Sequence, residues 1–190
     1  MRAAMATYNR AMNPAANLIL VGPMGAGKSC IGRRLADHYG LRLVDADREI
    51  EQRTGASVAT IFECEGEAGF RVRERAALGE LLAGDGVLLA TGGGAVLDAE
   101  NRRLLRARGF VVHLQVSPAQ QLARLARDTT RPLLQRDDRE AVLDRMATTR
   151  APLYAEVADL QFDTNGLVAA EAAARLIVLL DHRWQRGVAA

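Results

Sequence analysis

Gly22-Pro-Met-Gly-Ala-Gly-Lys-Ser29 is the stretch that decides how this chain folds. The apolar run Leu18–Val21 precedes it, and residues 30–39, which are helical in character, follow it. A strand, the spacing G-x-x-x-x-G-K-[S/T] and a helix together define a P-loop, a turn that binds nucleotide phosphates. The glycines let backbone N–H groups point inward, where they form an anion cradle with the positive end of the helix. We expect Lys28 to reach the β- and γ-phosphates and the Ser29 hydroxyl to bind Mg²⁺.

Lys28 is the only lysine of the chain, since the other basic residues among the 25 Lys+Arg are arginines. A compact ammonium is thus present where a planar guanidinium would not fit the same role. The alternative is a glycine-rich turn that meets the pattern by chance. The flanking strand and helix and the single lysine make this alternative the weaker one.

The overall composition is that of one globular domain. The chain has 190 residues, of which 49% are hydrophobic and 25% charged, and this balance is ordinary for a folded protein. It contains no apolar run near the roughly 20 residues that span a bilayer, so we expect no membrane partner. Two cysteines form no disulfide framework, which predicts a reducing, cytoplasmic location. The first 16 residues hold no continuous apolar segment, so they are predicted to be a disordered extension and not a signal peptide.

Strands and helices are predicted to alternate along the chain. Apolar runs predict strands at residues 18–21, 41–44, 87–91, 110–116 and 160–162. Helical spacing predicts helices at residues 28–39, 48–53, 58–65, 67–82, 98–108 and 168–180. Two more helices are predicted, one that begins at residue 118 and one that follows the polar residues 128–138 and ends at about Arg150. The polar residues 128–138 predict a mobile loop. This alternation indicates a single α/β domain on a parallel sheet, with ligands at the carboxyl ends of the strands.

Two aspartates follow the predicted second strand. A carboxylate at Asp45 or Asp47 lies where it can hold Mg²⁺ through water or accept a proton from an acceptor hydroxyl. The alternative for Asp47 is an N-cap of the next helix. The strand at 87–91 carries no acidic residue, so metal binding is expected to depend on Ser29 and Asp45.

Gly92, Gly93 and Gly94 also follow a strand directly. They expose amides and leave room for a ligand to lie against the backbone, although a flexible turn remains the alternative. Arginine has a planar fork suited to carboxylate or phosphate, but an exposed ion pair explains most arginines equally well. Spacing alone therefore does not select the functional arginines.

Six short segments in the same order make the chain resemble shikimate kinase from about residue 17 to 180. The segments are Gly-Pro-Met-Gly-Ala-Gly-Lys-Ser (22–29), Asp-Ala-Asp-Arg-Glu-Ile-Glu (45–51), Ile-Phe-Glu-Cys-Glu-Gly-Glu-Ala-Gly-Phe-Arg (61–71), Ala-Thr-Gly-Gly-Gly-Ala-Val (90–96), Thr-Arg-Pro-Leu-Leu (130–134) and Arg-Ala-Pro-Leu-Tyr (150–154). The resemblance implies an ATP-dependent phosphorylation of the shikimate 3-hydroxyl, a step of chorismate and aromatic amino acid biosynthesis. It also implies a P-loop kinase fold with a five-stranded parallel sheet of order 2-3-1-4-5.

The resemblance assigns roles to individual residues. It implies that the catalytic residues are Lys28, Asp47 and Arg131. It implies that ATP is bound by Gly25, Ala26, Gly27, Lys28, Ser29, Cys30, Arg124 and Arg131. It implies that shikimate is bound by Asp47, Arg71, Gly92, Gly93, Gly94 and Arg150, with Asp47 as the base and the two arginines on the carboxylate. It implies that Mg²⁺, the only cofactor expected, is held by Ser29 and, through water, Asp45.

The same resemblance divides the chain and suggests how it acts. It implies a kinase domain over 17–182, with a substrate-binding region at about 45–75, a lid at about 127–139 and a C-terminal tail at 183–190. ATP and shikimate are the expected partners of a cytoplasmic monomer. Cys30 departs from the family, where a small hydroxyl residue is usual, and the lost hydrogen bond to the α-phosphate is expected to cost about 1 kcal/mol. Residues 163–166 match only loosely, which leaves base specificity open.

Three other functions compete with this one. A different small-molecule P-loop kinase, such as a gluconate kinase, would share the nucleotide side but not the two arginines and the glycine turn. A catalytically silent sensor would not need all of Lys28, Ser29, Asp45 and Asp47. Nucleic-acid binding rests only on the many arginines, and neither the net charge of +2 nor the 4% aromatic content supports it.

Overall fold

The computed structural model describes residues 15–126 and 138–185, and the predicted lid therefore lies mostly outside the described residues. Five strands form one parallel sheet in the order β2-β3-β1-β4-β5. The strands are β1 (Leu18–Val21), β2 (Arg42–Asp45), β3 (Val87–Ala90), β4 (Phe110–Gln115) and β5 (Leu160–Asp163). The fold class and the strand order predicted from the sequence are both confirmed.

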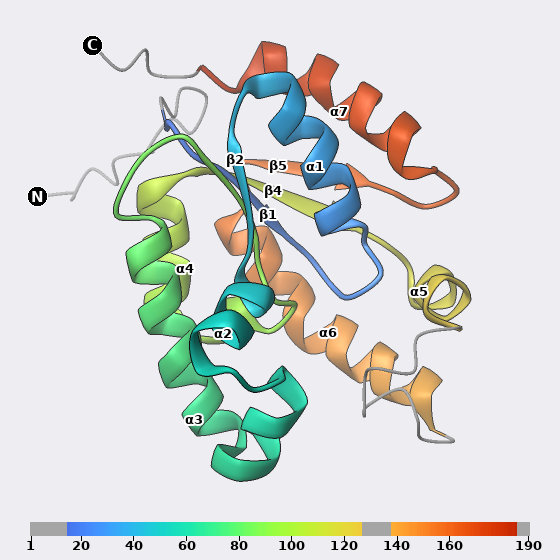
Figure 1. Cartoon of the computed structure of the whole chain (residues 1–190). Coiled ribbons are helices and arrows are strands. Elements are labelled where there is room, and N and C mark those ends of the chain that lie inside the picture. The colour runs from blue at the N-terminus through green and yellow to red at the C-terminus, as the bar shows by residue number, and fades with distance from the viewer. Residues whose placement is uncertain (1–14, 127–137, 186–190) are drawn as a thin grey trace, which may run out of the picture.

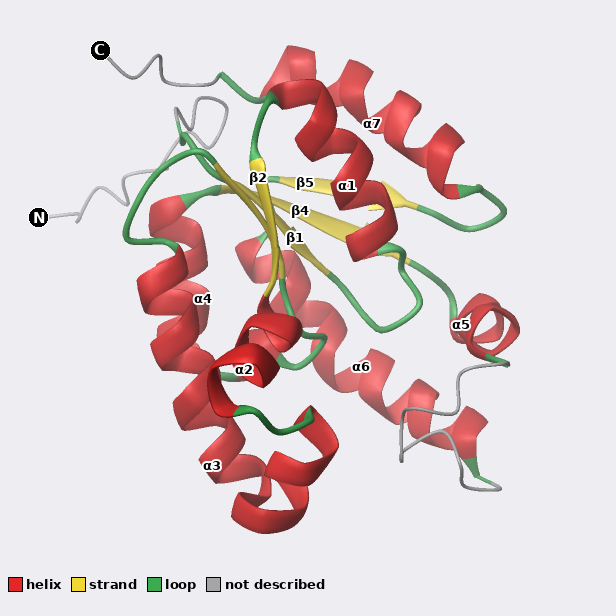
Figure 2. Ribbon diagram, viewed as in Figure 1, coloured by secondary structure: helices red, strands yellow, loops and turns green. Residues whose placement is uncertain are grey.

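Helices cover both faces of the sheet (Figures 1 and 2). The helices are α1 (Lys28–Tyr39), α2 (Ala46–Thr54), α3 (Val58–Leu81), α4 (Ala99–Arg108), α5 (Pro118–Leu125), α6 (Arg139–Val157) and α7 (Ala169–Arg183), with a short 3-10 turn at Ala95–Leu97. Helices α1 and α7 lie on one face of the sheet, and α4, α6 and the C-terminal part of α3 lie on the other, while α2 and the first part of α3 extend beyond the end of the sheet (Figure 1).

The central strands are buried on both faces, which explains their continuous apolar sequences. Leu18 and Leu20 of β1 pack on the side of α1 and α7, whereas Ile19 and Val21 pack on the side of α3, α4 and α6. All four side chains of β1 have no exposed area. The strand that leads into the P-loop is therefore held firmly from both sides.

Helix α6 differs from the prediction, which ended it at Arg150. It continues to Val157 with Pro152 inside it, although an interior proline removes a backbone hydrogen bond and usually costs about 3 kcal/mol. Tyr154 and Val157, which follow the proline, are 3% and 0% exposed. Burial of these two side chains under the sheet offsets the local cost, so tertiary packing overrides the local signal.

Helix α3 contains the break that the sequence predicts at Gly66. This glycine has φ 69° and ψ −178°, which divides the helix into residues 58–65 and 67–81. Phe62 before the break and Phe70 after it lie with their ring centroids 4.7 Å apart. The first part of α3 therefore packs back onto the second part.

Both ends of the described chain pack together. The Trp184 side chain is 5% exposed, and its Nε1–H donates to the Ala15 carbonyl at 2.8 Å. The ring of Tyr39, at the end of α1, meets Trp184 edge-on. No helix within residues 15–126 and 138–185 has the length and apolarity that a membrane crossing requires.

Candidate active site

The P-loop connects β1 to α1 with its lysine folded back on the turn. Lys28 Nζ donates to the carbonyl oxygens of Gly22 at 2.7 Å and Pro23 at 2.9 Å. Gly27 is the N-cap of α1, has φ 95° and provides no side-chain cap. The first N–H groups of the helix thus have no side-chain acceptor at the N-cap, which is the arrangement that binds a phosphate.

Gly22 shows why this turn needs glycine. Its φ is 144°, and a Cβ atom at this position would collide with the backbone carbonyl of Leu114 on β4. A backbone neighbour cannot rotate away as a side chain can. The P-loop is therefore fixed against the sheet by its own backbone.

Ser29 and Asp45, the residues predicted to bind metal, lie side by side. The Ser29 hydroxyl donates to Asp45 Oδ2 at 2.6 Å. No group of three or more His, Cys, Asp or Glu side chains suited to a metal occurs in the described part of the chain. Mg²⁺ in kinases is bound by one or two protein oxygens together with phosphates and water, so this pair of oxygen donors fits such an ion.

The alternative considered for Asp47, an N-cap, is wrong. Asp45 is the N-cap of α2 and accepts from the Arg48 backbone N–H at 3.4 Å. Asp47 lies in the first turn of the helix, where its side chain points toward the glycine turn after β3: a Cβ atom at Gly92 would lie 2.6 Å from Asp47 Oδ1. Glycine at position 92 thus leaves room for this carboxylate and for Glu74 Oε1, which would lie 3.1 Å from the same Cβ atom.

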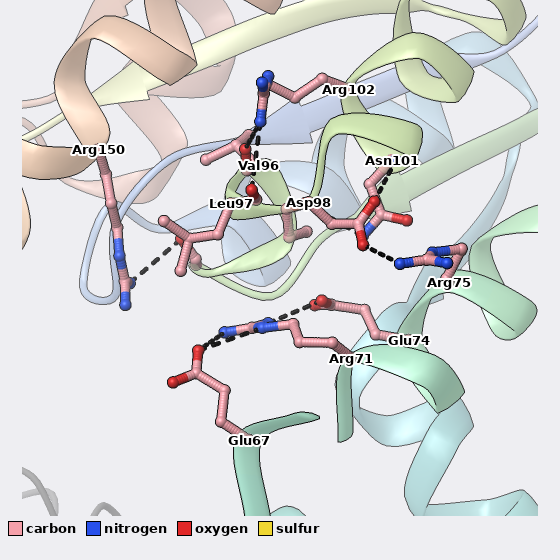
Figure 3. A network of polar contacts seen from close by, with 12 residues as sticks. Glu67, Arg71, Glu74, Arg75, Val96, Leu97, Asp98, Asn101, Arg102 and Arg150 are labelled. Carbon is pink, nitrogen blue, oxygen red and sulfur yellow. Dashed lines mark hydrogen bonds and ion pairs between the residues drawn. The ribbon is translucent and has the colours of Figure 1, made fainter. Parts of the chain in front are cut away.

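Arg71 of α3 lies beside the same turn. A Cβ atom at Gly94 would collide with its guanidinium group. Arg71 Nη1 donates to Glu74 Oε2 at 2.7 Å, and Arg71 Nη2 donates to Glu67 Oε1 at 3.0 Å (Figure 3). The Arg71 side chain is 16% exposed, so it is held in place by its two partners and is not fully buried.

Glu74 is a site residue that the sequence prediction missed. Its side chain is 0% exposed, and its Oε1 has no hydrogen-bond partner among the described residues. Burial raises the pKa of this carboxyl group, while the charge of Arg71 acts in the opposite direction. The available signal was its position three residues after Arg71 and between Phe70 and Leu78, which are both buried on the same helix.

Arg150 of α6 approaches the glycine turn from the other side. Arg150 Nη1 donates to the Gly93 carbonyl at 3.2 Å, and Tyr154 Oη donates to the same oxygen at 2.5 Å. The Tyr154 ring stacks on His113 of β4 with centroids 4.7 Å apart. Burial raises the pKa of Tyr154 to about 12, so its hydroxyl keeps the proton that it donates to the turn.

The two sides of the site meet at Gly93. A Cβ atom there would lie 3.5 Å from the Met24 nitrogen and 3.6 Å from the Gly22 oxygen, both in the P-loop. A cavity of about 190 Å³ lies beside this contact and is lined by P-loop, β4, α5 and α6 residues, including Met24, His113 and Arg150. The glycine turn, with Asp47, Arg71 and Arg150 around it, is thus adjacent to the P-loop, where the terminal phosphate of a nucleotide is expected.

The remaining predicted residues are placed as follows. Arg124 of α5 donates to the Gly25 carbonyl at 2.9 Å and to Thr164 Oγ1 at 3.1 Å, so it ties the P-loop to the segment after β5. Cys30 is exposed at the start of α1. Arg131 lies outside the described residues.

Comparisons with known proteins agree on one family. A family model described as shikimate kinase matches residues 24–181. A shikimate kinase of Stenotrophomonas maltophilia (strain R551-3) is 61% identical over 175 residues, which cover 92% of this chain and 97% of that protein. One from Xanthomonas campestris pv. campestris (strain 8004) is 58% identical over 174 residues, covering 92% and 97%. The structure of a shikimate kinase from Acinetobacter baumannii in complex with shikimate has a TM-score of 0.84 and 46% identity, covering 87% of this chain and 93% of that one.

Proposed function

The chain belongs to the shikimate kinase family, and we propose that the residues converging on the glycine turn after β3 carry out the reaction of that family. The protein transfers the γ-phosphoryl group of ATP to the 3-hydroxyl of shikimate and releases shikimate 3-phosphate and ADP. One observation carries the assignment of roles. Asp47, Arg71 and Arg150 come from three different helices, yet all three side chains lie against residues 92–94, which touch the P-loop.

The acceptor side fits an anionic polyol. Arg71 and Arg150 flank the glycine turn and provide planar forks for the shikimate carboxylate. Asp47 lies next to Gly92, at the end nearer α2, where it accepts hydrogen bonds from hydroxyls and takes the proton of the attacking one. The two arginines of the protein thus match the carboxylate of shikimate, and the aspartate matches its hydroxyl groups.

The nucleotide side fits a triphosphate. In the role proposed here, Lys28 exchanges its two P-loop carbonyl contacts for the β- and γ-phosphates, while the N-terminal amides of α1 bind phosphate oxygens. Ser29 and, through water, Asp45 would hold Mg²⁺, which would supply positive charge to the phosphates. Arg131 and the predicted lid at 127–139 complete the proposal by adding charge and excluding water.

The proposal includes the setting in which the enzyme acts. We expect a cytoplasmic monomer whose partners are ATP and shikimate, with neither nucleic acid nor membrane involved. The two free cysteines, Cys30 and Cys64, are both exposed, which suits a reducing compartment. Sedimentation at several protein concentrations tests the monomer, because a dimer would sediment faster as concentration rises.

The experiment that tests the proposal measures ADP release from ATP and Mg²⁺ with shikimate, gluconate or quinate as acceptor. We expect release that requires shikimate and that is lost in Lys28→Ala. Release with gluconate alone would overturn the assignment of the acceptor side. Tight shikimate binding without any release would favour a sensor in place of an enzyme.

A further inference from the structure

Arg71 is held by two carboxylates that differ in their freedom to move. Glu67 Oε1 accepts from Arg71 Nε at 3.3 Å and from Nη2 at 3.0 Å, whereas Glu74 Oε2 accepts from Nη1 (Figure 3). The Glu74 side chain is 0% exposed, but that of Glu67 is 61% exposed. Only Glu67 can leave the guanidinium and enter water without first moving the core of the protein.

The backbone at Glu67 also differs from that at Glu74. Glu67 follows Gly66, the residue with positive φ that interrupts α3, so its side chain starts at the break and not in the middle of a continuous helix. Glu74 lies two turns further along the same helix, within its regular part. The two carboxylate partners of Arg71 thus differ in position along α3 as well as in burial.

The edge of Arg71 that Glu67 occupies is one that a substrate carboxylate would use. The Nε and Nη2 hydrogens of a guanidinium point in parallel and form a two-pronged fork for a carboxylate. Negative charge is already abundant here, since, in addition to burial, the charges of Asp47 and Asp98 both raise the pKa of Glu74. A further carboxylate that joined Glu67 on the same fork would add repulsion, and an exchange avoids it.

We propose that Glu67 is an internal competitor for Arg71: its carboxylate occupies the fork in the free enzyme and is displaced by the carboxylate of shikimate. This inference rests on the proposed role of Arg71 as a shikimate ligand. The contact keeps the guanidinium oriented and its charge compensated while the site is empty. In exchange it weakens the binding of shikimate, so Glu67 sets the affinity for the acceptor without touching it in the complex.

The test is the affinity of Glu67→Gln for shikimate, measured by calorimetry without nucleotide. Because the Glu67 side chain is 61% exposed, its ion pair with Arg71 is of the weak, solvent-screened kind, and the dissociation constant should fall about two- to fivefold. The KM for shikimate should fall by the same factor while the KM for ATP stays unchanged. The methyl ester of shikimate, which has no carboxylate to exchange, should bind the variant and the native enzyme equally.

Two further variants make the test specific. Glu67→Asp keeps the charge but shortens its reach toward Arg71, so it should tighten shikimate binding by a smaller factor than Glu67→Gln. Glu63→Gln is the matched control, because it removes an exposed charge from the part of α3 before the break, whereas the carboxylates that contact Arg71 in the described chain are Glu67 and Glu74. Urea unfolding of each variant confirms that all are compared as folded proteins.

Each outcome separates the inference from the proposed function. Weaker or unchanged shikimate binding in Glu67→Gln would overturn the competitor role, as would equal tightening in Glu63→Gln. If Arg71→Ala fails to weaken shikimate binding, the assignment of Arg71 itself is wrong. If Arg71→Ala weakens binding and Glu67→Gln does not tighten it, only the competitor role is lost.

Discussion

The proposed nucleotide side of the site is one continuous segment that offers mainly backbone groups, whereas the proposed acceptor side consists of charged side chains from separate helices. Residues 22–29 provide the turn, the helix N-terminus and Lys28, and the turn is fixed because Gly22 abuts the backbone of β4. Asp47, Arg71 and Arg150 instead come from α2, α3 and α6. A site built from backbone is rigid, while one built from paired charges can be adjusted by exchanging partners.

The first prediction tests whether the two sides are separable. Lys28→Ala should lower kcat by roughly three orders of magnitude, because it removes the positive charge that the transferred phosphoryl group requires. Shikimate binding without nucleotide should be unchanged, since the acceptor residues come from other elements. Steady-state kinetics and calorimetry measure the two effects. A variant that also lost shikimate binding would show that the P-loop supports the acceptor side directly.

The second prediction concerns the carboxylate that faces the glycine turn. Asp47→Asn should lower kcat by roughly a hundred- to a thousandfold, because an amide cannot take the proton of the attacking hydroxyl. ATP binding should stay at the native level. Asp37→Asn, at an exposed position on α1, serves as the control for loss of a carboxylate. Native turnover in Asp47→Asn would exclude this residue as the base.

The third prediction concerns the effect of acid on His113 of β4, whose ring stacks on Tyr154. Burial, and to a lesser extent the charge of Lys28, holds the pKa of His113 at about 4, below its usual 6.5. Between pH 4 and pH 6.5 the unfolded chain binds more protons at this residue than the folded chain does. The contribution of His113 to the stability of the fold is therefore full above pH 6.5 and is lost as the pH falls toward 4. Urea unfolding should show a loss of roughly 2 kcal/mol between pH 7 and pH 5 from this residue.

His113→Phe tests this cause because it keeps a ring against Tyr154 and removes the titration. Its stability should change less than that of the native protein over the same pH range, whereas His182→Gln, at an exposed position, should behave like the native protein. The pH dependence of Glu74 has the opposite sign, since burial raises the pKa of this carboxyl group and its contribution to stability is lost as the pH rises. Equal acid sensitivity of native protein and His113→Phe would contradict the prediction.

Local sequence predicts the nucleotide side well because its geometry is local. The strand, the glycine spacing and the following helix are contiguous, and β1 is buried on both faces, so its apolar run has one interpretation. The break at Gly66 is local in the same sense, since glycine readily adopts positive φ. The strand order followed from the resemblance to a family, because no local signal specifies which strands pair.

Features that depend on distant residues were predicted less well. The sequence places a proline after Arg150, but only the burial of Tyr154 and Val157 explains why α6 continues past it. The start of α2 was predicted two residues late, which made Asp47 a candidate cap in place of Asp45. Glu74 was missed because its burial results from packing around residues 92–94, which are close in space but not in sequence.

The smallest effect on activity is expected from substitutions in the glycine turn, where the Arg71 side chain can move away from an added methyl group. A Cβ atom at Gly94 would meet the outer end of the Arg71 side chain, whereas one at Gly93 finds only ordinary contacts, the nearest at 3.5 Å. Gly94→Ala should therefore displace Arg71 and raise the KM for shikimate about fivefold, the effect of weakening one charge-assisted hydrogen bond. Gly93→Ala should have less effect, because it keeps the carbonyl that accepts from Arg150 and Tyr154. Both variants should leave the KM for ATP unchanged. If Gly93→Ala raised the KM for ATP instead, the contact between the turn and the P-loop would be tighter than the contact with Arg71, and the acceptor side would share the rigidity of the nucleotide side.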